Sequence, residues 1–306
     1  FIFLIGAVGT VCGAVLGCWL LGSRIDGLAK VAAMMTGSYI GGGVNFVALA
    51  DAFHTEGTLV SATVVADNLN MAVYFLVLLK CVGSAFFQKH YSHPHMDRVA
   101  REGREDAQTQ AAAYWQPKNI SLKDIALDLF YAVAVVTLSQ NLGKALGAAI
   151  PTGSGLGHMA NTFFSSQYVW ITLFSMGFAT FFEKQAAALA GAQEIGTYFI
   201  SLFFFAIGVP ASILEILRNA PLLFVFCFLM VVVNMAFCFV GGKLFHFSLE
   251  DIVLASNANI GGPTTAAGMA ISQGWTALVG PSMLVGTFGY GIGTYLGMVV
   301  GGILGA

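Results

Sequence analysis

The chain has 306 residues with 13 basic and 15 acidic side chains, and 57% of its residues are hydrophobic while 9% are charged. This near-neutral balance gives no argument for nucleic acid or an anionic membrane surface as a partner. Several apolar runs approach or exceed the roughly 20 residues that a helix needs to cross a bilayer. The composition therefore predicts an all-α, multi-pass integral membrane protein, a transmembrane helical bundle surrounded by lipid.

The apolar runs are separated by one long polar stretch. The predicted spans lie near residues 1–22, 28–50, 58–87, 125–148, 167–183, 195–210, 221–243, 250–272 and 276–304. The polar stretch, 88–118, carries five Lys and Arg side chains, and positive charge next to membrane segments marks the cytoplasmic side. We therefore predict a first transmembrane part over 1–87, a cytoplasmic linker over 88–118 and a second transmembrane part over 119–306.

Two glycine-interrupted runs occupy matching places in otherwise apolar segments, at 36–45 (TGSYIGGGVN) and 256–265 (SNANIGGPTT). In lipid, Gly and Pro at membrane depth leave backbone amides and carbonyls free, which is tolerated only beside protein or a water-filled cavity. A pair of such discontinuous helices is typical of a transporter's binding site. The alternative is that the glycines only permit close helix packing.

Internal duplication is indicated by the order of these segments. The stretch 1–86 aligns with 221–306 without a gap, and both copies contain an apolar helix, a polar turn, a broken segment and a long apolar helix. Three apolar segments precede the second copy, so we expect about three further helices before Phe1. If every segment crosses the membrane once, the two broken segments are six crossings apart and run parallel to each other. Inverted repeats would need an odd number of crossings between them. Both orientations stay open.

The second broken segment suggests how a site is built. Ser248 to Asp251 reads as a capping box, and the helix it starts should stop near Asn259, before glycine and proline. Thr264 and Thr265 are placed to cap a second half-helix. Carbonyls at the end of one half-helix suit a cation, and amides at the start of the next suit an anion. The predicted substrate-binding residues are Gly41, Gly42, Gly43, Asn45, Asn257, Asn259, Gly261, Gly262, Thr264 and Thr265.

Asp67 and Asn68 lie in the apolar run 58–87, about ten residues from its start, which places them near the middle of a span of roughly 20 residues. A carboxylate at that depth costs several kcal/mol without a partner and is functional by default. We predict that Asp67 and Asn68 bind a coupling ion, Na⁺ or H⁺. The alternative is a structural Asp that bonds to a neighbouring helix.

Other reactive side chains give weaker signals. The five cysteines lie apart in apolar segments, which suggests neither a disulfide framework nor a zinc site. His90, His93 and His95 fall in the polar linker and read as a solvated segment. No nucleophile and base pair, metal cluster or phosphate loop has the required spacing. We therefore expect no enzyme activity, no metal site and no cofactor beyond the coupling ion.

Three stretches carry a resemblance to a known family: TGSYIGGGVNFVALADAF, LASNANIGGPTTAAGMA and GTFGYGIGTYLG. They resemble the YjcL-like membrane proteins, the family of domain of unknown function 819, over essentially the whole chain. The Gly-Gly-Pro-Thr-Thr break is more remotely similar to the superfamily that groups cation/proton antiporters with anion and sodium–glutamate symporters. That resemblance implies two broken helices crossing at mid-membrane in inverted repeats, with Asp67 and Asn68 at the position of an ion-binding pair.

Three functions follow as hypotheses. The first is an ion-coupled secondary transporter of a small organic anion, working by alternating access. The second is a cation/proton antiporter without an organic substrate. The third, disfavoured by the missing catalytic spacing, is an intramembrane enzyme or assembly scaffold. The expected partners are a small molecule or ion and the lipid bilayer, no nucleic acid is expected, and a homodimer is left open.

Overall fold

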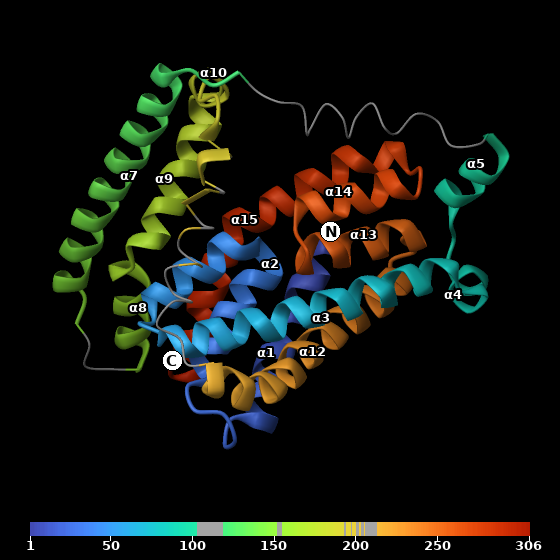
Figure 1. Ribbon diagram of the computed structural model, residues 1–306, viewed down its shortest axis with the longest axis horizontal. Coiled ribbons are helices and arrows are strands. Elements are labelled where there is room, and N and C mark those ends of the chain that lie inside the picture. The colour runs from blue at the N-terminus through green and yellow to red at the C-terminus, as the bar shows by residue number, and fades with distance from the viewer. Residues whose placement is uncertain are drawn as a thin grey trace.

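The computed structural model describes residues 1–102, 119–151 and 155–306, apart from 193, 197, 200, 201, 203, 204 and 206–212. Every regular element over these residues is a helix, in agreement with the predicted all-α class. The helices are α1 (Ile2–Leu21), α2 (Leu28–Ala52), α3 (Gly57–Gly83), α4 (Ala85–His90), α5 (Pro94–Glu102), α7 (Leu122–Ala149), α8 (Gly155–Ser165), α9 (Gln167–Phe181), α10 (Glu183–Ala187), α12 (Ile213–Leu244), α13 (Leu249–Ile260), α14 (Pro263–Ser272) and α15 (Thr276–Leu304) (Figure 1).

Within the described residues, five helical stretches are long and apolar enough to cross a bilayer. They are Ile2–Leu21, Gly57–Gly83, Leu122–Ala149, Ala220–Leu244 and Thr276–Leu304, and each matches a span predicted from hydropathy. The short predicted span 195–210 falls largely outside the described residues, as does 103–118 of the polar linker. The two broken segments do not count among these five, because their arms are short and carry polar residues.

Helix α2 changes direction in its middle. Gly42 has a φ of 72° and a ψ of −176°, which interrupts the helical backbone. Gly37 lies directly against the side chain of Leu49. In one continuous helix these residues would be about 18 Å apart, at about 1.5 Å per residue. The two arms of α2 therefore fold back on each other, and we call residues 28–52 the first hairpin.

The second broken segment has the same design. Helix α13 ends at Ile260, Gly262 has a φ of 86° and a ψ of −179°, and α14 begins at Pro263. Asn257 Nδ2 lies 3.5 Å from the sulfur of Met269, and the two helices lie side by side in Figure 1. We call residues 249–272 the second hairpin. Gly42 and Gly262, the two tips, occupy equivalent positions when 1–86 is aligned with 221–306.

The ends of the second hairpin partly correct the predicted capping. Ser248 Oγ accepts the Asp251 backbone N–H at 3.1 Å, so the predicted start of α13 is confirmed. The prediction that Thr264 and Thr265 cap α14 is wrong, because Gly262 is the N-cap and Pro263 takes the first helical position. Proline has no N–H to leave unpaired there, so it starts a helix readily.

Close helix contacts in the bundle depend on glycine. Gly6, Gly9, Gly13 and Gly17 of α1 face α12, and a Cβ on Gly13 would lie 2.9 Å from the Met230 Cα. Helix α15 presents glycines in the same way to the first hairpin and to Pro263 of the second. Small residues at these positions let backbones approach closely, which is how helices associate in lipid, where hydrophobic burial gives little driving force.

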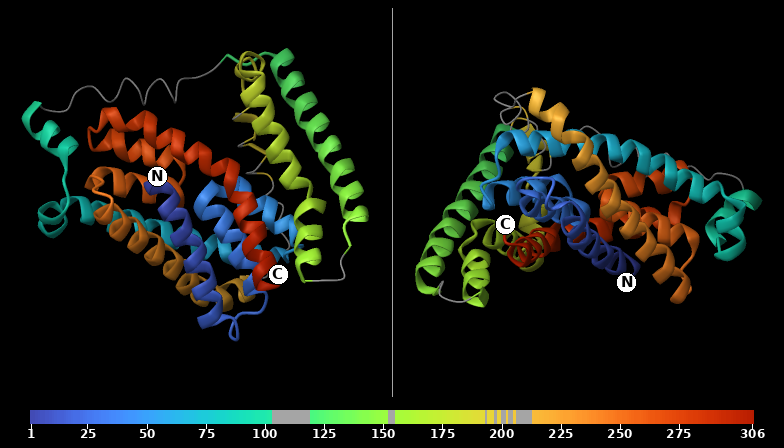
Figure 2. Two further views of the ribbon diagram at one scale, coloured as in Figure 1. Left: turned by 180° about the vertical axis from the view of Figure 1, so that it is seen from behind. Right: turned by 90° about the horizontal axis from the view of Figure 1, so that it is seen from below.

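Helices α7, α8 and α9 form a flank of their own, visible in both views of Figure 2. Tyr131 of α7 packs on Phe178 of α9, with ring centroids 4.6 Å apart. Two hydroxyls join this flank to the rest: Tyr168 donates to Asp51 Oδ2 at 2.9 Å, and Tyr295 donates to the Val169 carbonyl at 3.0 Å. The flank thus reaches the return arm of the first hairpin and the end of α15.

Candidate site at the two hairpin tips

The first tip is held by the side chain of Asn45, which follows the break closely in sequence. Asn45 Nδ2 donates to the Gly41 carbonyl at 2.5 Å and to the Tyr290 carbonyl at 3.3 Å. Its Oδ1 accepts from the hydroxyl of Thr294. The amide thus bridges the two arms of the hairpin and ties them to α15. At 3% exposed, Asn45 is engaged on both its amide nitrogen and its oxygen.

The second tip is held by Thr265, which takes the place of Asn45 in the second copy. Thr265 Oγ1 lies 2.9 Å from Asn257 Oδ1 and 3.0 Å from the Gly262 carbonyl, and it is the donor to both. Asn257 Nδ2 returns a bond to the Thr265 carbonyl at 3.3 Å. A Cβ on Gly261 would lie 2.8 Å from Asn257 Oδ1, so glycine is needed for this closure. The polar groups of this tip therefore join its own two arms.

Both tips face one side chain, Tyr290 of α15. A Cβ built on Gly42 would lie 3.0 Å from Tyr290 Cε1, and one built on Gly262 would lie 3.8 Å from the Tyr290 hydroxyl oxygen. At both positions the nearest atom belongs to Tyr290, once the chain neighbours of each glycine are left out. Tyr290 is 40% exposed, so part of its side chain stays open while other parts of it face the two tips.

A second polar cluster joins the first hairpin to α3. The Tyr39 hydroxyl donates to Asp67 Oδ1 at 2.6 Å, and Asn70 Nδ2 donates to the Tyr39 oxygen at 3.0 Å. Tyr39 and Asn70 are fully buried and Asp67 is half-buried. Asn70 Oδ1 is buried without a hydrogen-bond partner. This places a carboxylate in the middle of a spanning helix, bonded to the arm of the hairpin that leads to Gly42.

A buried chain of hydroxyl and amide groups fixes the middle of α13, the first arm of the second hairpin. The Tyr74 hydroxyl donates to Ser256 Oγ at 2.9 Å, and Ser256 donates to Asn234 Oδ1 at 2.9 Å. Asn234 Nδ2 then donates to the Gly6 carbonyl at 2.8 Å and to Thr10 Oγ1 at 3.0 Å. Four helices, α3, α13, α12 and α1, therefore meet through one network.

The structure brings most of the predicted binding residues to the tips but separates some. Gly43 is exposed, with no atom within 4 Å of a Cβ built there. Asn259 donates to the Phe3 carbonyl at 3.0 Å and so faces α1, while Thr264 is half-buried. Asn68 is exposed on α3 and does not share the Asp67 cluster, which has Asn70 in its place.

Four residues of this region were missed from sequence: Tyr39, Asn70, Tyr290 and Thr294. Asn70 could have been found, since residues three apart on a helix share a face. The other three lie in glycine-rich stretches, and nothing local in those stretches shows which side chains meet the hairpin tips. No group of three His, Cys, Asp or Glu side chains able to hold a metal occurs among the described residues.

The family comparison agrees with the resemblance noted from sequence. A family model described as "Protein of unknown function (DUF819)" matches residues 1–306. The chain belongs to the DUF819 family. The uncharacterized membrane protein YjcL of Bacillus subtilis (strain 168) is 44% identical over 301 residues, which cover 98% of this chain and 74% of the relative. No solved structure matches.

This DUF819 protein is therefore a multi-pass integral membrane protein, as the sequence predicted. Its candidate site combines two kinds of group. The hairpin tips offer backbone amides at the start of each return arm, where a helix has unpaired N–H groups and a positive dipole end. Asp67 offers one carboxylate, held by Tyr39 on the arm that leads to the first tip. By their chemistry, the groups at the tips suit an anion and the Asp67 carboxylate suits a cation or proton.

Proposed function

We propose that this DUF819 protein is an ion-coupled secondary transporter of a small organic anion that works by alternating access around its two hairpins. The observation that carries the proposal is the pair of tips: Gly42 and Gly262 share one backbone conformation, and both face Tyr290. Discontinuous helices at corresponding places in two halves of a transporter mark its binding site.

An anionic cargo is favoured by the direction of the helices at the tips. Each return arm begins at the tip, so its first N–H groups and its positive dipole end lie there. In the second hairpin those amides belong to Thr264 and Thr265, directly after Pro263. A carboxylate or similar group can accept several such N–H bonds without any cationic side chain.

The coupling group in this proposal is Asp67. A carboxylate in the middle of a spanning helix marks an ion or proton pathway. Its bond to Tyr39 connects its charge state to the first hairpin. Binding Na⁺ or a proton at Asp67 would remove the negative charge from this contact and so change what holds α3 to the hairpin.

We also propose that the two halves are inverted relative to each other, an arrangement that suits alternating access. Helices α1 and α12 occupy equivalent positions in the copies and pack antiparallel: Gly6 lies against Cys238 while Gly17 lies against Phe226. With the offset of 220 residues, Gly17 corresponds to Phe237 and Phe226 corresponds to Gly6. The contact between Gly17 and Phe226 therefore corresponds to one between residues 6 and 237, which lies next to the contact between Gly6 and Cys238. A pseudo-two-fold axis perpendicular to these helices, in the membrane plane, relates inverted repeats. In this proposal each hairpin returns to its own side of the membrane and adds no crossing. Five predicted spans then separate the two hairpins, and an odd number is what inverted repeats need.

The second candidate is a cation/proton antiporter without organic substrate. The specific observation in its favour is the Asp67 cluster, which has a carboxylate, a hydroxyl and an unpartnered amide oxygen but no group for an anion. Under this alternative the tips serve as gates and bind no cargo.

The first experiment screens the full-length purified protein for ligands by thermal shift. The probes are mono-, di- and tricarboxylates, each with and without Na⁺. A ligand that binds the folded state raises apparent stability by mass action, by about 2.7 kcal/mol at roughly 100 times its Kd. A carboxylate that raises the melting temperature identifies the class of cargo. If no carboxylate stabilises the protein under any ionic condition, the anion hypothesis is wrong.

The second experiment tests Asp67 in proteoliposomes. Asp67→Asn should abolish uptake of the identified carboxylate driven by a Na⁺ or proton gradient, because the neutral amide cannot change charge. Asp26→Asn, in the exposed turn before α2, is the control and should transport normally. Undiminished uptake by Asp67→Asn would remove this residue from the mechanism. Proton movement driven by Na⁺ or K⁺ alone, with no carboxylate present, would favour the antiporter.

A further inference from the structure

Residues 84–102, which contain α4 and α5, lie across the turn between α12 and α13. We call this segment the strap. Phe87 and Tyr91 of the strap pack around Phe239 of α12, with ring centroids 4.7 and 5.8 Å from it. The Tyr91 hydroxyl also donates to the Phe239 carbonyl at 3.1 Å. Burial in this contact raises the pKa of Tyr91 above its ordinary value.

The strap bonds to both sides of that turn. On the α12 side, Lys243 Nζ donates to the His90 carbonyl and lies 5.3 Å from the centre of the Tyr91 ring. On the α13 side, the Leu249 backbone N–H donates to the Ser92 carbonyl at 2.8 Å. Leu249 is the first residue of the second hairpin, so the strap holds that hairpin at its base.

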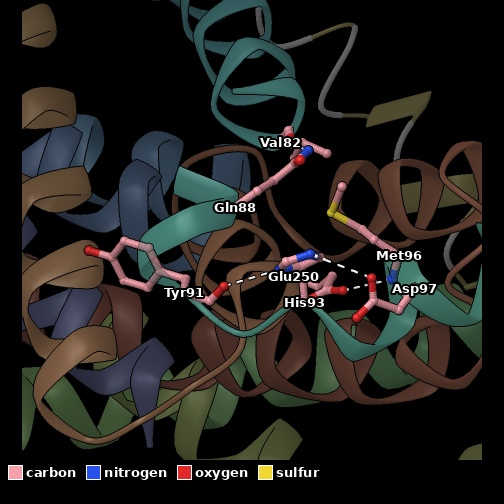
Figure 3. A network of polar contacts seen from close by, with 7 residues as sticks. All are labelled: Val82, Gln88, Tyr91, His93, Met96, Asp97 and Glu250. Carbon is pink, nitrogen blue, oxygen red and sulfur yellow. Dashed lines mark hydrogen bonds and ion pairs between the residues drawn. The ribbon is translucent and has the colours of Figure 1, made fainter. Parts of the chain in front are cut away.

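The central contact uses the carboxylate of Glu250. The Met96 backbone N–H donates to Glu250 Oε1 at 2.8 Å, as Figure 3 shows, with His93 and Asp97 paired beside it at 3.5 Å. Glu250 is fully buried, and its other oxygen, Oε2, has no hydrogen-bond partner. A buried carboxylate oxygen without a partner is costly, because it has lost its hydration and gained nothing in return.

We propose that the strap docks reversibly on the base of the second hairpin and that Glu250 sets the strength of docking. Oε1 fastens the strap through Met96, while the unsatisfied Oε2 favours release, since release returns it to water. The strap continues from α3, which carries Asp67, so release also frees the end of α3 from the hairpin base. This device does not rest on transport: it is a property of the contacts between residues 84–102 and 239–250.

Amide hydrogen exchange at Leu249 reports docking directly. The first N–H groups of a helix have no partner within it. Protection of the Leu249 amide therefore comes from the Ser92 carbonyl, which it loses when the strap leaves. The measurement uses the full-length protein in nanodiscs, with fragmentation that resolves single amides.

Two variants should weaken the docking of the strap on Glu250, and one should strengthen it. Glu250→Ala removes the acceptor, and Met96→Pro removes the donor, so both should speed exchange at Leu249 at least tenfold. Glu250→Gln keeps an oxygen for Met96 and removes the buried charge, so exchange should become slower than in the native protein. Proline at 96 stays within the first turn of α5, where its missing N–H breaks no helical bond.

His95→Pro is the matched control for Met96→Pro. It introduces the same ring one residue earlier in the same turn, where no bond to Glu250 exists, and should leave exchange at Leu249 within twofold of native. If Glu250→Ala and Met96→Pro leave that exchange unchanged, the strap is not held through Glu250. Equal acceleration by His95→Pro, or acceleration by Glu250→Gln, would also overturn the proposal.

Discussion

The helix that follows the first hairpin and the helix that follows the second contact the hairpins in different ways. Helix α15 packs along both: Gly286 lies against Pro263 of the second hairpin, and Gly289 lies against the Ile40 carbonyl of the first. Helix α3 meets the hairpins through the side-chain pairs Tyr39–Asp67 and Tyr74–Ser256, and α15 adds one hydroxyl bond of this kind, from Thr294 to Asn45. The two helices hold equivalent places in the order of elements, yet they contact the hairpins differently. One helix supplies close backbone contact and the other supplies charge.

The largest effect is expected from filling the close contact of α15. Gly289→Ala places a methyl group against the Ile40 carbonyl, where neither backbone can give way, so we expect a loss of more than about 3 kcal/mol in stability. Gly268→Ala, at an exposed position in the middle of α14, meets no atom within 4 Å and should stabilise that helix by about 1 kcal/mol. Thermal unfolding of both variants in one detergent measures the difference. Equal stability would mean that α15 does not support the first hairpin in this way.

A smaller and more selective effect is expected at the tips. Gly42→Ala and Gly262→Ala each force a side chain into positive φ with extended ψ, which costs about 1–3 kcal/mol. At Gly42 the methyl group also meets the Tyr290 ring at 3.0 Å, whereas at Gly262 the nearest atom is 3.8 Å away. Tyr290→Ala should therefore rescue part of the loss in Gly42→Ala and none in Gly262→Ala. A double-mutant cycle on unfolding free energies tests this, and equal coupling at both tips would contradict the placement of Tyr290.

The smallest effect distinguishes two neighbours on α3. Asn70→Ala removes the bond to the Tyr39 hydroxyl and should cost about 1 kcal/mol in stability while lowering ion-driven uptake. Asn68→Ala alters an exposed side chain and should change stability by less than about 0.5 kcal/mol. Parallel unfolding and uptake measurements decide between them. A larger loss in Asn68→Ala would restore the ion-binding pair expected from sequence.

Features that depend on a few neighbouring residues could be predicted from the sequence, and features that depend on distant contacts could not. The spans and the positions of the two breaks depend on hydropathy and on Gly and Pro, which act within a few residues. The glycine at position 42 does not by itself show whether the helix bends slightly or reverses its direction. The reversal depends on the contact between Leu49 and Gly37 on the two arms of the hairpin. The choice of Asn70 over Asn68 depends on the rotation of α3 about its axis, which neighbouring helices set. Tyr39 and Tyr290 became site residues only through contacts distant in sequence.

The packing of α15 against the first hairpin also bears on how the chain is made. The hairpin is complete at Ala52, whereas the helix that covers it begins at Thr276, and most of the chain lies between them. At a synthesis rate of about 5–20 residues per second, roughly 10–45 s pass before that cover emerges from the ribosome. During this interval the polar backbone at Gly42 has no α15 to shield it from lipid. The first hairpin is therefore expected to reach its final place only after α15 has been synthesised.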